Sequence, residues 1–576
     1  MKKMNFKYIL AAIIGLSFSF TGCNDMLDLK PINEISDADY WKTSDQFQLS
    51  ANAYYNYLRS FSDILNDSPH ADRRGDFQYA GASNTFSAGA NTVGSTDSNW
   101  NTAYTRLREM NYLLAKAAEY SKPDEIAVYV AEAKFFRAYI YFDLLQQFGG
   151  VPLILKPMEV SSDELQAPRN TRDEVVDQII KDVEEAIAVL PLESAITAAN
   201  KGRVSQGAAQ AFLGRVALYE GTWQKFRNNA TRANTLLDKA ISSSAAIITS
   251  AQYTLYAPAV LGDSAQKYMF ILEDEKSNPA GLQKSSNKEY ILSNRYSYTL
   301  RQIRMNVTKA TLGNVYWLTK KFADMYLCQD GLPIEKSPLF KGYATTTSEY
   351  VNRDNRMRYT FMIDGRYYWD NHTPGARTTW TGDAVDRASS RGIQNGATNS
   401  GYNNQKWSSE RSINDNEEAY DYPVIRYAEV LLNYAEAVYE RNGSITDADL
   451  DKSLNLVRNR VNKTMPKLSN SFVSSNGLDM RTEIRRERNI ELYFEGFRVD
   501  DLKRWKTAET ELPMDLQGIT WTGTQWATKW AGISSRIVNG VFRLESGRTW
   551  ADKNYLLPIP SQQIQLNPNL TQNPGW

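Results

Sequence analysis

The chain has 576 residues, of which 42% are hydrophobic, and 66 basic residues balance 66 acidic ones. This apolar fraction is enough to bury a large core, which excludes a globally disordered chain. The balanced charge gives no electrostatic reason to expect nucleic acid or an acidic surface as partner. With two histidines and two cysteines, the composition also argues against a multi-histidine metal site and a disulfide framework.

The N-terminus predicts a membrane anchor. Lys2, Lys3 and Lys7 precede an apolar run over residues 9–20, which is too short to span a bilayer as a helix. Small residues and Cys23 follow, a pattern that resembles a bacterial lipoprotein signal. We therefore predict a signal peptide over residues 1–22 and a tether over 23–39 that is lipidated at Cys23. The alternative is an ordinary secretory signal with an incidental cysteine.

Helical periodicity dominates the first half of the mature chain. Thr171 and Glu174 form a capping box at the start of the best-marked helix, and Pro191 follows its end. Apolar residues recur at helical spacing in each of the other predicted helices. The predicted helices cover residues 40–58, 100–120, 128–148, 171–190, 205–219 and 233–246.

The middle of the chain loses this periodicity. Residues 268–272 and 289–295 have the composition of short strands, and residues 319–326 are predicted to form a short helix. Residues 341–415 are rich in Gly, Asn, Ser and Thr and carry scattered aromatic residues. We expect a loop-rich insert over about 255–420.

Helices return in the last third, over residues 423–443, 448–461 and 480–505, and an extended segment follows. Helix pairs thus recur at 100–148, 171–219 and 423–461, although the strict 34-residue tetratricopeptide signature is absent. The predicted fold is mostly α, with divergent tetratricopeptide-like helix pairs and an irregular loop-rich ligand-binding portion that contains short strands. The helical scaffold is expected over about 40–250 and 420–510, and the extended C-terminal segment over about 510–576.

Three glutamates at a spacing of four, Glu487, Glu491 and Glu495, are predicted to share one helix face. Paired carboxylates can serve as the acid and nucleophile of a glycosidase. Arginines are interleaved with them, however, and a neighbouring guanidinium lowers a carboxyl pKa, which is the wrong direction for a general acid. We therefore interpret them as a structural ion-pair network with the nearby arginines Arg485, Arg486, Arg488 and Arg498.

Several segments, in one order across nearly the whole mature chain, resemble the SusD/RagB family of Bacteroidetes nutrient-binding lipoproteins. They are AEAKFFRAY (131–139), FGGVP (148–152), DG (330–331), NRD (352–354), YAEVLLNYAEA (427–437), IRRERNIEL (484–492), FEGFR (494–498), DLKRW (501–505), YLLPIP (555–560) and NPNL (567–570).

The resemblance implies four tetratricopeptide-like helix pairs, no catalysis, and a SusC-like TonB-dependent transporter as partner, over which the protein sits as a hinged lid. It also implies capture of an oligo- or polysaccharide by a lipid-anchored protein on the cell-surface side of the outer membrane. Asn24, Asp25 and Asp28 resemble the surface-export signal of such lipoproteins. Three alternatives stay open: peptide capture by the same fold, a surface glycosidase, and a helical scaffold without a small ligand. No cofactor is expected, and whether a cation such as calcium binds is left open.

The predicted ligand-binding residues come from three loops. Asp72 and Arg73 can hydrogen-bond to sugar hydroxyls, or can form a solvated turn or an internal salt bridge. Trp100, with Asn101 beside it, heads a helix after a polar loop, where its ring can stack on a sugar or pack under the loop. Similar family loops supply aromatic residues to the glycan site, so Tyr296 and Trp317 complete the set. For Trp369, Trp380 and Trp407 the sequence does not rank ligand, transporter and loop packing.

Overall fold

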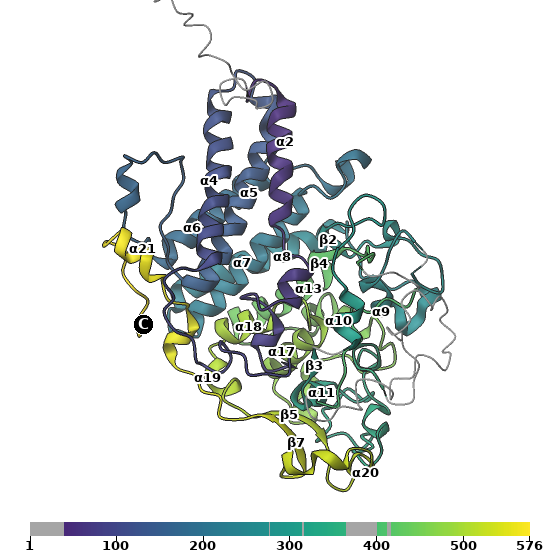
Figure 1. Ribbon diagram of the computed structural model, residues 1–576. Coiled ribbons are helices and arrows are strands. Elements are labelled where there is room, and N and C mark those ends of the chain that lie inside the picture. The colour runs from purple at the N-terminus through teal and green to yellow at the C-terminus, as the bar shows by residue number, and fades with distance from the viewer. Residues whose placement is uncertain (1–39, 276, 314–315, 364–399, 412–415) are drawn as a thin grey trace, which may run out of the picture.

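The computed structural model describes residues 40–275, 277–313, 316–363, 400–411 and 416–576 (Figure 1). The predicted signal peptide and tether, with Cys23, lie outside these residues, as do Trp369 and Trp380. Helices dominate, and the strands are short and form small sheets, so the predicted mostly-α fold class is confirmed.

The helical scaffold is a row of long helices in which neighbours in the chain pack side by side (Figure 1). Helix α2 packs on α5, helices α4 to α8 pack in succession, and α13 packs on α8 and α7. These helices are α2 (Ser44–Tyr54), α4 (Ser98–Glu119), α5 (Pro123–Phe148), α6 (Arg172–Ile187), α7 (Gln206–Lys225), α8 (Ala230–Ser250) and α13 (Tyr427–Asn442).

Local sequence determines where several of these helices begin. The Thr171 hydroxyl caps α6, and the Glu174 carboxylate accepts a hydrogen bond from the Thr171 backbone N–H at 2.7 Å, which completes the predicted capping box. The Asp97 carboxylate caps α4 by accepting from the N–H groups of Asn99 and Trp100. These caps satisfy backbone donors that a helix start would otherwise leave unpaired.

The loop-rich portion follows α8 and contains short elements. They are α9 (Ala265–Phe270), β2 (Tyr290–Asn294), α10 (Val307–Gly313), β3 (Trp317–Leu318), α11 (Lys320–Met325) and α12 (Met357–Thr360). The predicted strand at 289–295 is confirmed as β2, but the predicted strand at 268–272 is wrong, because α9 covers most of it. A short buried apolar run is compatible with either structure, so periodicity alone could not decide.

The strands of the described residues form three small antiparallel sheets, two of which join distant parts of the chain. Strand β3 pairs with β1 (Gln78–Tyr79), and β2 pairs with β4 (Tyr422–Arg426). The third sheet has the order β5–β7–β6, formed by β5 (Leu516–Thr520), β6 (Ile537–Val538) and β7 (Val541–Glu545). Because β4 takes residues 422–426, the helix predicted from residue 423 begins only at Tyr427.

Two other predicted helices are each divided into shorter ones. Residues 448–461 contain α14 (Asp447–Asp451) and α15 (Leu454–Asn459), and residues 480–505 contain α17 (Met480–Glu491) and α18 (Arg498–Arg504). The remaining helices are α3 (Phe61–Leu65), α16 (Asn470–Ser475), α19 (Ala508–Glu511), α20 (Trp526–Lys529) and α21 (Ser561–Leu566). Glu495 therefore lies beyond the end of α17 and does not share its helical face.

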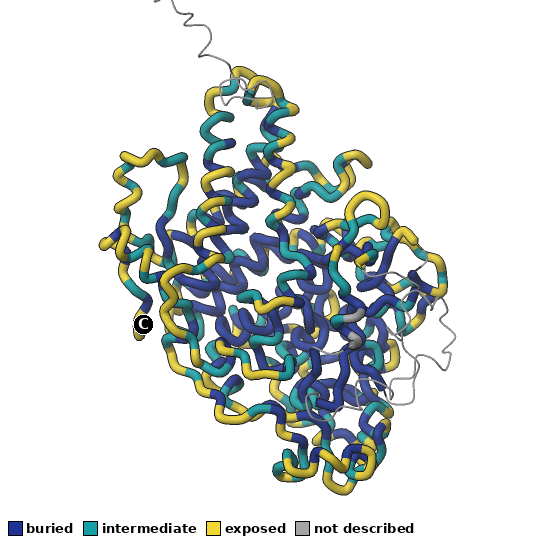
Figure 2. The backbone as a smooth tube through the Cα atoms, viewed as in Figure 1, coloured by how far each residue is buried: buried dark blue, intermediate teal, exposed yellow. Residues whose placement is uncertain are grey.

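One large hydrophobic cluster runs through both the helical scaffold and the loop-rich portion (Figure 2). The aromatic residues Phe61, Trp407 and Tyr422 illustrate this, because they belong to three separate segments and their rings are 5.1–5.9 Å apart. Buried aromatic contacts of this kind fix the loops against the helices. Among the described helices, none combines the length and the apolar character that crossing a bilayer requires.

Candidate functional site

A polar groove with a volume of about 310 Å³ opens where three segments meet. One wall is the segment before and within α3, a second is the start of α4, and the third is the C-terminal half of α5. The lining residues are mostly polar: Asn56, Tyr57, Arg59, Ser60, Ser62, Asp63, His70, Ser98, Asn99, Thr102, Arg106, Asp143 and Gln147, with Leu58, Pro69, Ala103, Ile140 and Leu144.

The start of α4 presents one helical face to the groove. Ser98, Asn99 and Thr102 are exposed, and Arg106 continues the same face one turn later. The Asp97 cap, which bonds to the Asn99 N–H at 2.8 Å, fixes this end of the helix. Exposed amide and hydroxyl groups therefore stand in a fixed position where a hydroxyl-rich ligand can bond to them.

Charged pairs hold the groove together beneath these groups. The Arg59 Nη2 donates to Asp143 Oδ1 at 2.9 Å, and His70 Nδ1 lies 2.7 Å from Asp500 Oδ2. His70 Nε2 is also 3.5 Å from Asp143 Oδ1. These contacts link the segments on either side of α3 to α5 and α18, so the groove has a preorganised base.

One tyrosine side chain, that of Tyr57, lines the groove. Tyr57 is half-buried, the Arg106 guanidinium lies 4.5 Å from its ring centroid, and its hydroxyl donates to Glu109. Burial and the Glu109 hydrogen bond together raise the pKa of Tyr57 well above its usual value. A neutral phenol ring beside exposed amides and hydroxyls can bind a sugar by ring contact and by hydrogen bonds.

Of the predicted ligand residues, Tyr296 does not line the groove but contacts α3, which does. Its ring centroid is 6.1 Å from that of Phe61, and the Arg301 guanidinium lies 4.9 Å from the ring. Its backbone N–H donates to Asp421 Oδ1 at 2.9 Å, which fixes the loop.

Trp100 and Asn101 do not line the groove. Trp100 is 3% exposed and packs edge-on against Phe148 at 5.1 Å, so it adopts the packing alternative. Asn101 is exposed, but the groove is lined by its neighbours Asn99 and Thr102. The sequence predicted a helix start at residue 100, whereas α4 begins at Ser98, and other residues of its first turns line the groove.

The other three predicted residues also lie elsewhere. Asp72 is 1% exposed and accepts from the N–H groups of Gly496 and Arg498 at 3.4 Å each, and burial raises the pKa of Asp72 to about 7. Arg73 is half-buried beside it. Trp317 is 7% exposed, and its ring lies 6.2 Å from that of Tyr79 across the β1–β3 pair. Trp407 is 1% exposed and belongs to the core.

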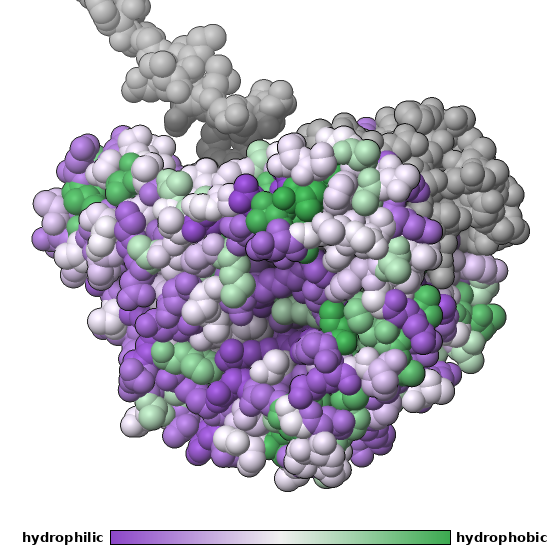
Figure 3. Space-filling model, turned by 90° about the horizontal axis from the view of Figure 1, so that it is seen from below, coloured by the Kyte–Doolittle hydropathy of each residue, from purple (hydrophilic) through white to green (hydrophobic). Residues whose placement is uncertain are grey.

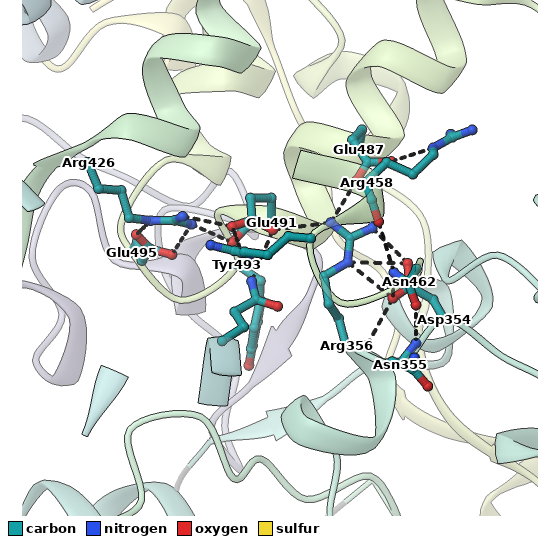
Figure 4. A network of polar contacts seen from close by, with 12 residues as sticks. Asp354, Asn355, Arg356, Arg426, Arg458, Asn462, Glu487, Glu491, Tyr493 and Glu495 are labelled. Atoms are coloured by element: carbon teal, nitrogen blue, oxygen red, sulfur yellow. Dashed lines mark hydrogen bonds and ion pairs between the residues drawn. The ribbon is translucent and has the colours of Figure 1, made fainter. Parts of the chain in front are cut away.

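The glutamates at 487, 491 and 495 lie in a buried ion cluster (Figure 4). The cluster contains five basic and five acidic residues, each at most 7% exposed: Arg356, Lys406, Arg426, Arg458 and Arg460 with Glu289, Asp354, Glu487, Glu491 and Glu495. The ion-pair interpretation is therefore confirmed, and the charges balance within the cluster.

The partners of these glutamates differ from those predicted. Glu491 lies between Arg426 Nη1 at 2.7 Å and Arg356 Nη1 at 3.1 Å, and Arg460 also pairs with it. These arginines outweigh the effect of burial and hold the pKa of Glu491 far below its usual value. The predicted partners pair elsewhere: Arg488 with Asp501, Arg498 with Asp76, Arg486 with Glu483, and Arg485 with Glu440.

This cluster does not have the features of a glycosidase site. A general acid needs a raised pKa and access to substrate, whereas Glu491 is fully buried with a lowered pKa. No group of three or more His, Cys, Asp or Glu side chains suited to a metal ion occurs among the described residues. Cys328 is buried and free.

The face seen in Figure 3 is largely hydrophilic, with hydrophobic residues in separate small patches and a hollow near its centre. A surface of this kind does not resemble the broad apolar patch of an obligate protein interface. Together, the helical scaffold and the polar groove define a protein built on helix pairs, with a candidate ligand site between three of its segments.

Comparison with known families identifies the class. The model described as "SusD family" matches residues 275–576, and that described as "Starch-binding associating with outer membrane" matches residues 25–218. The chain therefore belongs to the SusD family, whose members are known as carbohydrate-binding surface proteins.

Two curated relatives come from Formosa agariphila. SusD-like protein P38 is 26% identical over 199 residues, which cover 32% of this chain and 37% of that protein. SusD-like protein P2 is 24% identical over 241 residues, covering 39% and 45%. The matched regions thus span less than half of each relative.

Solved structures show the same fold over nearly the whole chain. A SusD-like carbohydrate binding protein from Bacteroides fragilis has a TM-score of 0.72 at 23% identity, with 92% of this chain and 99% of that chain covered. Surface glycan-binding protein A from Bacteroides fluxus has a TM-score of 0.59 at 20% identity, with 93% and 100% covered.

Proposed function

We propose that this protein is a cell-surface glycan-binding lipoprotein that captures an oligo- or polysaccharide in the groove and delivers it to a SusC-like TonB-dependent transporter. The observation that carries the proposal is the groove itself, which exposed amides and hydroxyls of α4 line together with the ring of Tyr57. Rings and directional hydrogen-bonding groups together match the alternating apolar and polar surfaces of a sugar.

Anchoring completes this proposal. An acylated Cys23 would hold the protein at the outer membrane, since each buried CH₂ contributes about 0.8 kcal/mol and several chains together resist dissociation. Residues 24–39 would then act as a tether that lets the body close over the transporter as a lid. Metabolic labelling with a fatty-acid analogue should mark the wild type and leave Cys23→Ala unlabelled.

Calorimetric titration with a panel of neutral oligosaccharides tests the groove. Tyr57→Ala should weaken binding of the active sugar by about two- to tenfold, which corresponds to the roughly 0.5–1.5 kcal/mol of a ring contact. Asn99→Ala should have a similar effect through a lost hydrogen bond of about 1 kcal/mol. Asn101→Ala is the matched control, because Asn101 is an exposed asparagine on the same helix outside the groove.

The same titrations separate the alternatives. Binding of oligopeptides instead of saccharides would replace glycan capture by peptide capture in the same fold. Release of reducing ends from the glycan panel would show a glycosidase. Equal affinity of the wild type, Tyr57→Ala and Asn99→Ala for a sugar would place its site outside this groove.

A further inference from the structure

A second cavity, larger than the groove, lies beside strand β2. It has a volume of about 570 Å³ and is formed by the segment before α7, the segment after α8, and β2 with the loop before it. None of the predicted ligand residues lines it. Its size is within the range of cavities that hold small-molecule ligands.

The lining of this cavity is net positive. Five basic side chains, Lys201, Arg203, Lys284, Lys288 and Arg295, line it together with three acidic ones, Glu193, Asp274 and Asp421. Two of the acids are already paired, since Lys201 Nζ lies 2.8 Å from Glu193 Oε1 and Lys284 Nζ lies 2.7 Å from Asp421 Oδ1. Arg203 pairs with Glu132.

Lys288 and Arg295 remain as the cations available to a ligand. Both are exposed, and in the described part of the chain no salt bridge joins either one to an acidic residue. Arg295 is nevertheless held in place, because its Nη1 donates to the Lys201 carbonyl at 2.7 Å. Its other N–H groups stay available for an anion, and a guanidinium binds carboxylate or sulfate through paired hydrogen bonds.

Gly202 makes room for this arginine. Gly202 has φ +98°, and a Cβ at this position would lie 2.6 Å from the Arg295 Cδ. A residue with a side chain would therefore be strained and would also push Arg295 away from its place over the backbone. The local backbone is thus shaped around the position of Arg295.

One buried residue, Asn294, links the walls of the cavity and the groove, although it lines neither. The Asn294 side-chain amide donates to the carbonyls of Leu58 and Arg59, which line the groove, at 3.3 Å each. Its neighbours Ser293 and Arg295 line the cavity. The cavity and the groove are therefore neighbours in the fold.

We propose that this cavity is a second subsite that binds an acidic group of the glycan, a uronate carboxylate or a sulfate ester, through Arg295 and Lys288. The inference rests on the proposed glycan capture and adds the charge class of the ligand. The protein would prefer an acidic polysaccharide to a neutral one of the same length.

Titrations of the mature protein with tetragalacturonate, its methyl-esterified form and a sulfated carrageenan tetrasaccharide test this subsite. We expect the wild type to bind at least one charged probe more tightly than the uncharged one. Arg295→Gln and Lys288→Gln should each weaken binding of that probe about tenfold, which is typical of a lost hydrogen bond to a charged group. Arg295→Lys should recover part of the affinity, and added salt should weaken it.

Lys341→Gln is the matched control, because Lys341 is an exposed lysine that does not line the cavity. Equal binding of charged and uncharged probes, or unchanged affinity in Arg295→Gln and Lys288→Gln, would overturn the subsite. If binding of a neutral sugar still required Tyr57 and Asn99 in that case, the groove would stand as the glycan site. Failure of every saccharide to bind would instead overturn the proposed function and the subsite with it.

Discussion

Removing one carboxylate from the buried ion cluster should destabilise the protein strongly. In Glu491→Gln the neutral amide replaces a fully buried carboxylate that is shared by Arg356, Arg426 and Arg460. The cluster then carries one uncompensated positive charge, since its five bases and five acids balance in the wild type. Breaking a buried pair in this way typically costs about 3–5 kcal/mol.

This cost converts into a measurable change in melting temperature. An unfolding entropy of about 2.1 cal/mol/K per residue gives roughly 1.1 kcal/mol/K for a mature chain of this length, so Tm should fall by about 3–5 °C. Differential scanning calorimetry measures it directly. Glu184→Gln is the control, because the pair of Glu184 with Lys239 is on the surface, where the two side chains are 49% and 30% exposed. Loss of this pair should cost at most about 1 kcal/mol. If Glu491→Gln had the same Tm as Glu184→Gln, the cluster would not stabilise the fold as argued.

Three further predictions concern stability. Burial raises the pKa of Glu349 to about 7, above the pKa of the same carboxyl in the unfolded state. Between these two pKa values the folded state keeps a proton that the unfolded state has lost, so Tm should fall from pH 5.5 to 8. The fall should be smaller in Glu349→Gln, and an equal slope in both proteins would contradict this prediction. Gly150→Ala should cost about 1–3 kcal/mol, because the new Cβ would lie 2.2 Å from the Asn170 carbonyl oxygen, whereas Gly532→Ala, with open space around it, should melt like the wild type. Thr171→Ala should cost about 1 kcal/mol through the lost cap of α6, and urea unfolding at unchanged m-value checks this.

Local patterns predicted the helical scaffold well, because caps and apolar stripes act within one or two turns. The start of α6 at its Thr171 cap is an example. Prediction failed where a strand partner from far along the chain decided the structure. Residues 422–426 continue the pattern of the following helix, yet they form β4 because β2 lies beside them.

The groove was only partly predictable for the same reason. The polar loop indicated the start of α4, which lines the groove, but none of the predicted ligand residues is among the residues that line it. Whether Asn99 or Trp100 faces the groove depends on how α4 packs against α5, where Trp100 meets Phe148. The ion cluster shows the same limit, since the partners of Glu491 lie 31, 65 and 135 positions away in the chain.

A crystal structure of the mature protein with its tightest-binding oligosaccharide tests the central claim most directly. We predict sugar density in the groove, with one ring against Tyr57 and hydroxyls within hydrogen-bond distance of Asn99 and Thr102. Density at another face of the molecule, with the groove empty at saturating ligand, would contradict the account.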